Sequence, residues 1–181
     1  MKGVKIRSTT ILGVRRGRQI ALGGDGQVTF GDMAMKQKAV KVRDFDTDQG
    51  KVLGGFAGAA ADALNLFEKF EQKLDEYNGD LKRAVVELAK EWRTDKYLRH
   101  LEALLALMNR QGSYIVSGDG NVIEPDGPVI AIGSGGGYAQ AAASAFLENK
   151  SLSAADVVRK SLKIASQLCI YTNDSITVLE D

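Results

Sequence analysis

Two adjacent threonines, Thr9 and Thr10, open an apolar run that continues through Val14. A threonine hydroxyl is a weak nucleophile, and it needs a base within hydrogen-bonding reach to lose its proton. A free α-amino group on the same residue can be that base. Cleavage of the chain between Ser8 and Thr9 would therefore give residue 9 both a nucleophile and a base.

Three other polar residues become relevant if Thr9 is a nucleophile. Asp25 lies in a glycine-rich turn, Lys41 in an otherwise apolar stretch and Ser134 in a glycine-rich loop. A partly buried lysine near Thr9 would lower the pKa of the amine and of the hydroxyl, and an aspartate would offset part of the lysine's desolvation. On spacing alone the structural interpretation is favoured, in which Thr-Thr opens a strand, Asp-Gly makes a turn and the lysine extends to solvent.

Two glycine-rich tracts admit a chemical and a structural interpretation. Residues 54–58 end a predicted strand and lead into a helix, so their N–H groups could face an oxyanion or their glycines could serve a tight turn. Residues 133–137 do not fit a dinucleotide loop, because Tyr138 stands where that fingerprint needs glycine. No Gly-Lys-Ser or Gly-Lys-Thr occurs in the chain. We therefore expect no ATP bound by this chain through such loops.

The remaining candidates for nucleophilic or metal chemistry are weak. His100 is the sole histidine and sits among basic residues of a predicted helix, which favours a surface position. Cys169 is the sole cysteine and lies in an apolar helical pattern, which favours a small core residue. No group of histidine, cysteine and acidic residues has zinc spacing.

Composition narrows the class of protein. The 181 residues suit one domain, and 24 basic against 23 acidic side chains give a net charge of +1. That balance provides no electrostatic basis for binding nucleic acid or an anionic membrane. No apolar stretch is long enough to span a bilayer, and residues 1–8 lack the apolar segment of a secretory signal. A single cysteine is compatible with a reducing cytoplasm.

Periodicity predicts strands followed by helices, twice, and then a final strand. Residues 44–50 are expected to form a polar turn, and residues 96–108 have no clear period. Apolar spacings of three and four predict helices over 63–77, 81–92, 138–146 and 153–168, the last opened by a Ser153–Asp156 capping box. Alternation and turn residues predict strands over 9–14, 19–23, 27–30, 38–42, 51–57, 114–116, 122–123, 129–132 and 176–179. This order favours an α+β fold with two antiparallel sheets between two helical layers.

Several motifs together resemble the HslV family of proteasome-like bacterial peptidases. The likeness runs from Thr9 to about Glu180 and favours the catalytic interpretation of Thr9, Asp25 and Lys41. The matching segments are residues 9–11, 24–29, 41–43, 55–58, 61–63, 87–90, 92–95, 101–105 and 169–173.

The resemblance implies a four-layer αββα sandwich of the N-terminal-nucleophile type, with residues 1–8 as a leader and 9–181 as a single peptidase domain. It implies a threonine-type endopeptidase that degrades unfolded polypeptides inside a chamber formed by two stacked six-membered rings. The expected location is the cytoplasm, and the expected partner is an HslU-type ATPase unfoldase.

By position, the resemblance implies that Thr9 is the nucleophile and that Lys41 and Asp25 tune it. It implies that the Gly55 N–H donates to the oxyanion and that Ser134 supports the site.

The resemblance also implies a monovalent cation, usually sodium, bound by main-chain carbonyls of Ser166, Cys169 and Thr172. The chain departs from the family pattern at Ser166, which replaces a usual glycine, and at Gly137, where proline is common.

Three alternatives remain open from the sequence. Ser8 would be the terminal nucleophile if trimming stopped one residue early. The chain could be an N-terminal-nucleophile amidohydrolase that acts on a small amide. It could also be a non-catalytic ring subunit that keeps residues 1–8 permanently.

Overall fold

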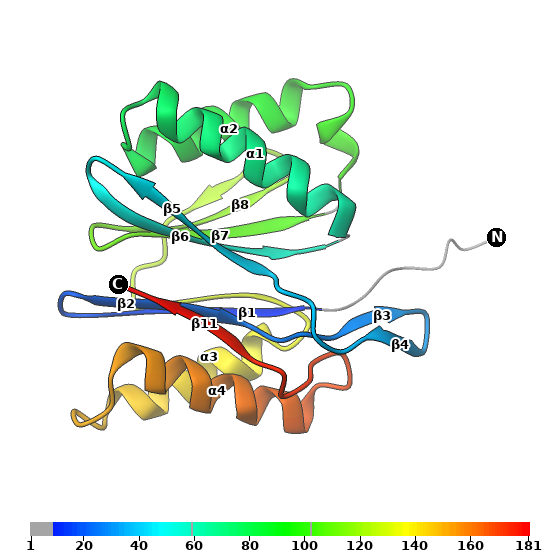
Figure 1. The fold of residues 1–181 in the computed structure, drawn as a ribbon, viewed down its shortest axis with the longest axis vertical. Coiled ribbons are helices and arrows are strands. Elements are labelled where there is room, and N and C mark those ends of the chain that lie inside the picture. The colour runs from blue at the N-terminus through cyan, green and yellow to red at the C-terminus, as the bar shows by residue number, and fades with distance from the viewer. Residues whose placement is uncertain (1–8, 59, 102) are drawn as a thin grey trace.

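The computed structural model describes residues 9–58, 60–101 and 103–181. The expected leader, including Ser8, lies outside the described residues. The chain forms four layers, with a helical layer on each outer face and two antiparallel sheets between them (Figure 1). The α+β sandwich predicted from the sequence is therefore confirmed.

The two sheets contain nine of the eleven described strands. The four-stranded sheet has the order β10-β1-β2-β11, formed by β1 (Thr10–Arg16), β2 (Gln19–Gly24), β10 (Val129–Gly133) and β11 (Thr177–Glu180). The five-stranded sheet runs in chain order through β5 (Val42–Thr47), β6 (Gly50–Ala57), β7 (Leu104–Met108), β8 (Ser113–Ser117) and β9 (Val122–Ile123). The hairpin of β3 (Val28–Phe30) and β4 (Met33–Lys36) extends from one end of the sandwich (Figure 1).

Two helix pairs cover the outer faces of the sheets. Helices α1 (Ala60–Glu76) and α2 (Leu81–Thr94) lie over the five-stranded sheet, and α3 (Gly136–Leu147) and α4 (Ala154–Leu168) lie under the four-stranded one (Figure 1). A short 3-10 turn, η1 (Leu98–His100), follows α2 and leaves His100 exposed. None of the described helices is long and apolar enough to cross a membrane.

Helix ends follow the local sequence signals. Asn78 and Gly79 take φ values of 52° and 78° just after α1, and such left-handed conformations end a helix. At the start of α4 the Ser153 side chain accepts from the Asp156 N–H, and the Asp156 side chain accepts from Ser153 in return. The predicted capping box is therefore confirmed.

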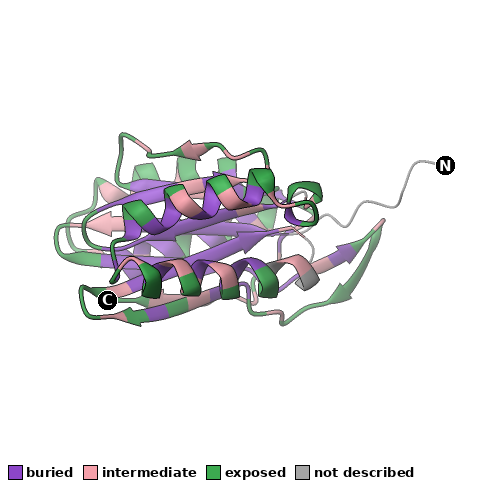
Figure 2. Ribbon diagram, turned by 90° about the horizontal axis from the view of Figure 1, so that it is seen from above, coloured by how far each residue is buried: buried purple, intermediate pink, exposed green. Residues whose placement is uncertain are grey.

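The core has three parts, one for each interface between layers. Buried residues face inward from every helix, whereas the outer helix faces are exposed (Figure 2). The third part lies between the two sheets, and its Val42 also lines the cavity described below. Its buried members are Ile11, Ile20, Leu22, Val42, Leu53, Ala57, Ala106, Met108, Ile130 and Ile132.

Strand register places the ends of several strands at the same edge of the sandwich. Thr10, the first residue of β1, pairs with Gly133, the last residue of β10. Gly24, the last residue of β2, pairs with Thr177, the first residue of β11. Because antiparallel neighbours run in opposite directions, the start of one strand lies beside the end of the next. Loops that are far apart in the sequence therefore meet at this edge.

The expected strand over 38–42 and polar turn over 44–50 are wrong. Strand β5 instead begins at Val42 and runs to Thr47. Phe45 is buried, while Asp44 and Asp46 face solvent and pair with Lys51 on β6. The charged residues occupy the exposed side of an alternating strand, and only the Thr47–Gly50 connection turns.

Two other strands were not predicted. The unassigned leucine-rich stretch contains β7, which lies between two strands in the sheet and is buried at Leu105, Ala106, Leu107 and Met108. Burial on both faces removes the alternation by which a strand is recognised. Strand β4 is exposed along its whole length, and its Met33 and Met35 carry no period that separates it from a loop.

Candidate active site

Thr9 lies immediately before β1, at the edge where the loops meet. Its side chain is buried, and its carbonyl accepts a hydrogen bond of 2.9 Å from the Ser134 N–H. Gly133 takes a φ of 89°, and a Cβ there would collide with the Thr9 carbonyl oxygen. The first glycine of the 133–137 loop is thus required for the backbone to approach Thr9. Ser134 contacts Thr9 through its backbone, and its side chain is exposed.

The Thr10 hydroxyl joins three segments of the chain. It accepts from the Gly135 N–H at 3.0 Å and lies 2.6 Å from the Thr172 hydroxyl oxygen. A Cβ on Gly135 would overlap the Thr10 hydroxyl and would lie 2.8 Å from the Thr172 Oγ1 atom. The loop before α3 and the loop after α4 are therefore both hydrogen-bonded to the first residue of β1.

Asp25 and Lys41 form a buried ion pair. The Lys41 Nζ atom lies 2.8 Å from Asp25 Oδ1, and the two side chains are 8% and 0% exposed. The same ammonium donates to the Gln27 carbonyl at 2.5 Å. Burial lowers the pKa of Lys41 from its ordinary value, and the charge and hydrogen bond of Asp25 oppose that shift.

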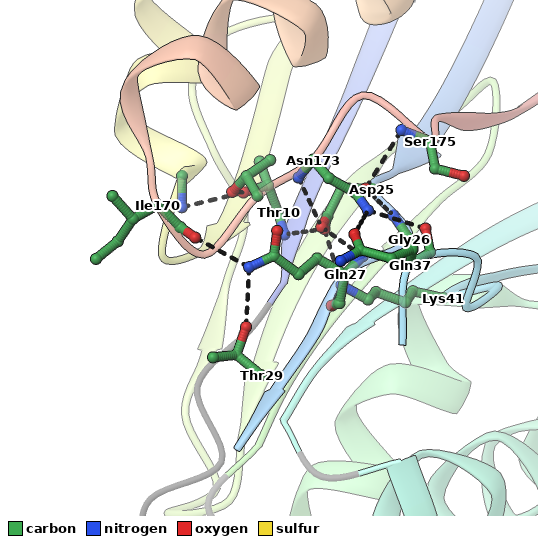
Figure 3. A network of polar contacts seen from close by, with 12 residues as sticks. Thr10, Asp25, Gly26, Gln27, Thr29, Gln37, Lys41, Ile170, Asn173 and Ser175 are labelled. Carbon is green, nitrogen blue, oxygen red and sulfur yellow. Dashed lines mark hydrogen bonds and ion pairs between the residues drawn. The ribbon is translucent and has the colours of Figure 1, made fainter. Parts of the chain in front are cut away.

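The Asp25 carboxylate accepts four hydrogen bonds (Figure 3). Oδ1 accepts from the Thr10 N–H and from Lys41, both at 2.8 Å. Oδ2 accepts from the Gln27 N–H at 2.9 Å and more weakly from the Asn173 N–H at 3.4 Å. A carboxylate has about four lone-pair positions, so this buried group is satisfied.

A cavity of about 370 Å³ opens beside these residues. Thr9, Lys41 and Gly58 all line it, so the candidate nucleophile, the ammonium and a backbone turn face one space. Apolar side chains make most of the wall, and Lys36 and Arg43 add positive charge. The remaining lining residues are Val28, Ala39, Val40, Val42, Phe56, Leu64 and Phe67. Such a cavity can hold an apolar side chain next to a hydroxyl nucleophile.

Gly55 does not occupy the place expected of an oxyanion donor. It lies inside β6, and the next residue, Phe56, donates its N–H to the Lys41 carbonyl on the β5 side. Because successive N–H groups of a strand point in opposite directions, the Gly55 N–H points towards β7, where its partner is Ala106. A Cβ on Gly55 would collide with Ile11, so the glycine serves packing between the sheets.

Gly58 is the glycine of this tract that reaches the cavity. It follows the last residue of β6 and takes a φ of 152°, a conformation that L side chains rarely adopt. The sequence showed the tract without showing where the strand ends. Of the glycines in this tract, the one that lines the cavity is the last, after the strand, and not those within the strand.

The three residues expected at a cation site lie at the end of α4 and in the following loop. Ser166 is in the last turn of α4, whose final carbonyls lack N–H partners within the helix. The Cys169 N–H donates to Ala165, and its carbonyl accepts from the Thr172 N–H at 3.0 Å. The Cys169 side chain is buried, as expected. Within the described residues, no group of three or more histidine, cysteine or acidic side chains could hold a metal ion.

A sandwich of two sheets, with a threonine immediately before the first strand and a buried lysine lining the same cavity, is the arrangement of the N-terminal-nucleophile class of folds. The model of the proteasome subunit family matches residues 6–180, and the chain belongs to that family. The resemblance and the fold class predicted from the sequence motifs are thereby confirmed.

Individual relatives agree with this assignment. The ATP-dependent protease subunit HslV of Aquifex aeolicus (strain VF5) is 55% identical over 177 residues, which cover 98% of this chain and 99% of the relative. The crystal structure of eukaryotic HslV from Trypanosoma brucei superimposes with a TM-score of 0.87 at 43% identity, covering 94% of this chain and 98% of that one. Thiobacillus denitrificans BPH in complex with epoxomicin gives a TM-score of 0.75 at 23% identity, over 95% and 97% of the two chains. At that identity the likeness shows the fold alone.

Gly135→Ala tests the close approach around Thr10. Gly135 has a φ of −93°, so alanine meets no backbone strain there, only the overlap with the two threonine hydroxyls. We expect a loss of about 1–3 kcal/mol in the free energy of unfolding, measured by denaturant titration. Gly137→Ala is the matched control, because a Cβ there meets nothing within 4 Å and alanine favours a helix. Equal stabilities of the two variants would contradict the packing described.

Asp25→Asn tests the buried ion pair. Removal of the carboxylate charge leaves the Lys41 ammonium uncompensated, and breaking a buried pair costs about 3–5 kcal/mol near neutral pH. The variant also loses the effects that raise the pKa of Lys41, so that pKa falls further below 10.5. Between the folded pKa and 10.5 the unfolded chain binds more protons, so stability rises with pH across that window.

The measurement is denaturant unfolding at several pH values and one protomer concentration. We expect the deficit of Asp25→Asn to shrink as the pH rises towards 10.5. Asp44→Asn is the control, since its partner Lys51 is at the surface, and a small effect is expected there. A deficit that stays constant with pH would contradict the assignment.

Proposed function

We propose that this chain is the peptidase subunit of an ATP-dependent protease, with Thr9 as the N-terminal nucleophile once residues 1–8 have been removed. Membership of the proteasome subunit family and 55% identity to an ATP-dependent protease subunit support this function. The observation that carries it is that Thr9 and a buried, Asp25-bound Lys41 line the same cavity.

In the proposed reaction the Thr9 α-amine takes the proton from its own Oγ, and Oγ forms a bond to the scissile carbonyl carbon. The resulting ammonium gives that proton to the leaving amine as the peptide C–N bond breaks. Water then attacks the acyl-enzyme ester and releases the second product with regeneration of the hydroxyl. The positive charge of Lys41 lowers the pKa of the neighbouring amine, so more of the amine is in its basic form at neutral pH.

The tetrahedral intermediate needs a hydrogen-bond donor for its oxyanion. We assign this role to the Gly58 N–H in place of the Gly55 N–H, which points into the sheet. Gly58 supports the assignment because it lines the cavity with Thr9 and lies beyond the last hydrogen-bonded residue of β6. Ser134 supports the site by fixing the Thr9 carbonyl through its N–H.

Exposed apolar side chains support assembly of several copies. Phe30, Met33 and Met35 of the β3–β4 hairpin are 51%, 67% and 64% exposed. Leu168, the last residue of α4, and Ile170 in the following loop are 60% and 79% exposed. Large apolar side chains that are exposed in this way are typical of protein–protein contacts. We propose two stacked six-membered rings in the cytoplasm, served by an HslU-type ATPase that unfolds substrates and supplies the nucleotide site.

A sodium ion bound by the carbonyls of Ser166, Cys169 and Thr172 is a further part of this proposal. The donor set suits it, because carbonyl oxygens at a helix C-terminus carry partial negative charge. The Thr172 side chain contacts Thr10, so an ordered loop here would steady the start of β1. The ion has no part in bond making.

Replacement of sodium by choline at equal ionic strength tests this site. A ligand that binds only the folded chain stabilises it by about 2.7 kcal/mol at 100 times its Kd. We expect a higher Tm in sodium chloride than in choline chloride for the wild type. A Tm independent of the cation would contradict the proposal.

Thr9→Ala tests the nucleophile. We expect hydrolysis of an unfolded protein, measured with the ATPase and ATP present, to fall by at least about 10³-fold while assembly is retained. Intact mass should show wild-type chains that begin at Thr9, and reaction with a peptide epoxyketone should add one inhibitor mass to them. Active chains that begin at Met1 or Ser8 would contradict the proposal. Turnover of a small amide without turnover of protein would identify an amidohydrolase instead.

A further inference from the structure

We propose that Asn173 is a positioning residue for the reaction. Its side chain bridges the two backbone segments that carry Asp25 and Lys41 and so fixes the positions of these two residues relative to each other. This inference rests on the proposed function. Asn173 lies in the loop between α4 and β11, far in sequence from both residues of the ion pair.

The Asn173 side-chain amide uses its whole hydrogen-bonding capacity (Figure 3). Its Oδ1 atom accepts from the Gly26 N–H at 3.0 Å and from the Ser175 N–H at 3.3 Å. Its Nδ2 atom donates to the Gln37 carbonyl at 2.9 Å and to Gln37 Oε1 at 2.8 Å. The partners fix the orientation of the amide, because backbone N–H groups require an oxygen and a backbone carbonyl requires the NH₂ group.

These contacts connect two segments of the site. Gly26 follows Asp25 directly, and Gln37 precedes Lys41 by four residues. The segments also touch each other through the Ala39 N–H, which donates to the Gly26 carbonyl at 2.9 Å. A Cβ on Gly26 would collide with the Gln37 carbonyl, so the backbones are already at closest approach. The Asn173 side chain adds hydrogen bonds to both segments at this junction.

The junction sets where the Lys41 ammonium sits. Both acceptors of Nζ, Asp25 Oδ1 and the Gln27 carbonyl, belong to the turn that Asn173 holds. The backbone N–H of Asn173 also reaches Asp25 Oδ2. If the turn moves away from the segment before Lys41, the ammonium loses contacts with both acceptors and shifts relative to Thr9. A displacement of about 1 Å in a reacting group can cost about 10²-fold in rate.

Other charges near Lys41 do not replace Asp25. Lys36 and Arg43 line the same cavity and are both positive. Arg43 is paired with Glu71 at 2.7 Å, where both side chains are more than 40% exposed. A weakened contact with Asp25 would therefore leave burial as the dominant effect on Lys41 and would lower its pKa further.

Two substitutions of Asn173 distinguish the effect of its hydrogen bonds from the effect of its size. Asn173→Ala removes all four side-chain contacts. Asn173→Asp keeps the shape and the acceptor for Gly26, but it places an oxygen where the two Gln37 oxygens need a donor. Asn149 supplies matched controls, because its Oδ1 also accepts from the N–H two residues on, that of Ser151, in an exposed loop. Asn149→Ala and Asn149→Asp have no link to the ion pair.

The experiment uses assembled enzyme with its ATPase, with rates expressed per chain that begins at Thr9 by intact mass. For both Asn173 variants we expect kcat to fall by about 10- to 100-fold, with KM changed by less than about 3-fold. For Asn173→Ala we also expect the pH profile of kcat/KM to move to lower pH on the limb that reports Lys41, whereas the added negative charge of Asn173→Asp opposes that shift. The Asn149 variants should match the wild type in all three measurements.

Two results would overturn the inference. One is a folded, assembled Asn173→Ala or Asn173→Asp enzyme with wild-type kcat and pH profile. The other is a rate loss in Asn173→Ala that follows a fall in Tm while the pH profile stays unchanged, which would mark a purely structural residue. Failure of the proposed function looks different: the mature wild type would not hydrolyse protein, or Thr9→Ala would retain hydrolysis. If the wild type is active and Thr9→Ala is not, the Asn173 comparison tests this inference alone.

Discussion

A single buried negative charge holds this site together. Asp25 has no exposed surface, and a buried carboxylate without hydrogen-bond donors would carry a large desolvation cost. Its four donors come from four segments: the start of β1, the turn after β2, the stretch before β5 and the loop after α4. Because each donor must reach the same carboxylate, these segments can meet in only one arrangement. The geometry of the proposed site follows from satisfying that charge.

Close approach of backbones is the second constraint, and glycine meets it at each junction. Gly133 lets the loop before α3 reach the Thr9 carbonyl, and Gly135 leaves room for the Thr10 and Thr172 hydroxyls. Gly26 lies against the Gln37 carbonyl. Side chains at these positions would separate the segments by more than a hydrogen bond can span. The glycine-rich loop of residues 133–137 is thus part of the support for residues 9 and 10 and not a phosphate loop.

Much of the fold could be predicted from sequence because its signals are local. The amphipathic faces of α1, α2 and α4 and the Ser153–Asp156 capping box each lie within a few neighbouring residues. Strand β5 was misplaced because its charged residues resemble a turn unless the burial of Phe45 is known. Family motifs pointed to Thr9, Asp25 and Lys41, and the structure brings Asp25 and Lys41 into contact and Thr9 into the shared cavity.

What could not be predicted depends on tertiary contacts. Gly55 and Gly58 are three residues apart, and only the observed end of β6 shows which N–H is free of the sheet. Asn173 is 147 residues from Gly26 and 136 from Gln37, so no local pattern relates them. Contacts of that kind depend on strand register, which places both sides of the junction at one edge.

The ion pair also explains why the lysine is buried at all. In the proposed reaction Lys41 lowers the pKa of the Thr9 amine through its charge, and water and salt screen a charge at a surface. Burial removes the screening but favours the neutral form of Lys41, which would abolish the effect. Asp25 resolves this conflict by stabilising the ammonium without exposing it. The pair then adds little net charge to the site, so the direction in which Lys41 points, rather than its presence alone, determines the field at Thr9. That direction is what the surrounding hydrogen bonds maintain.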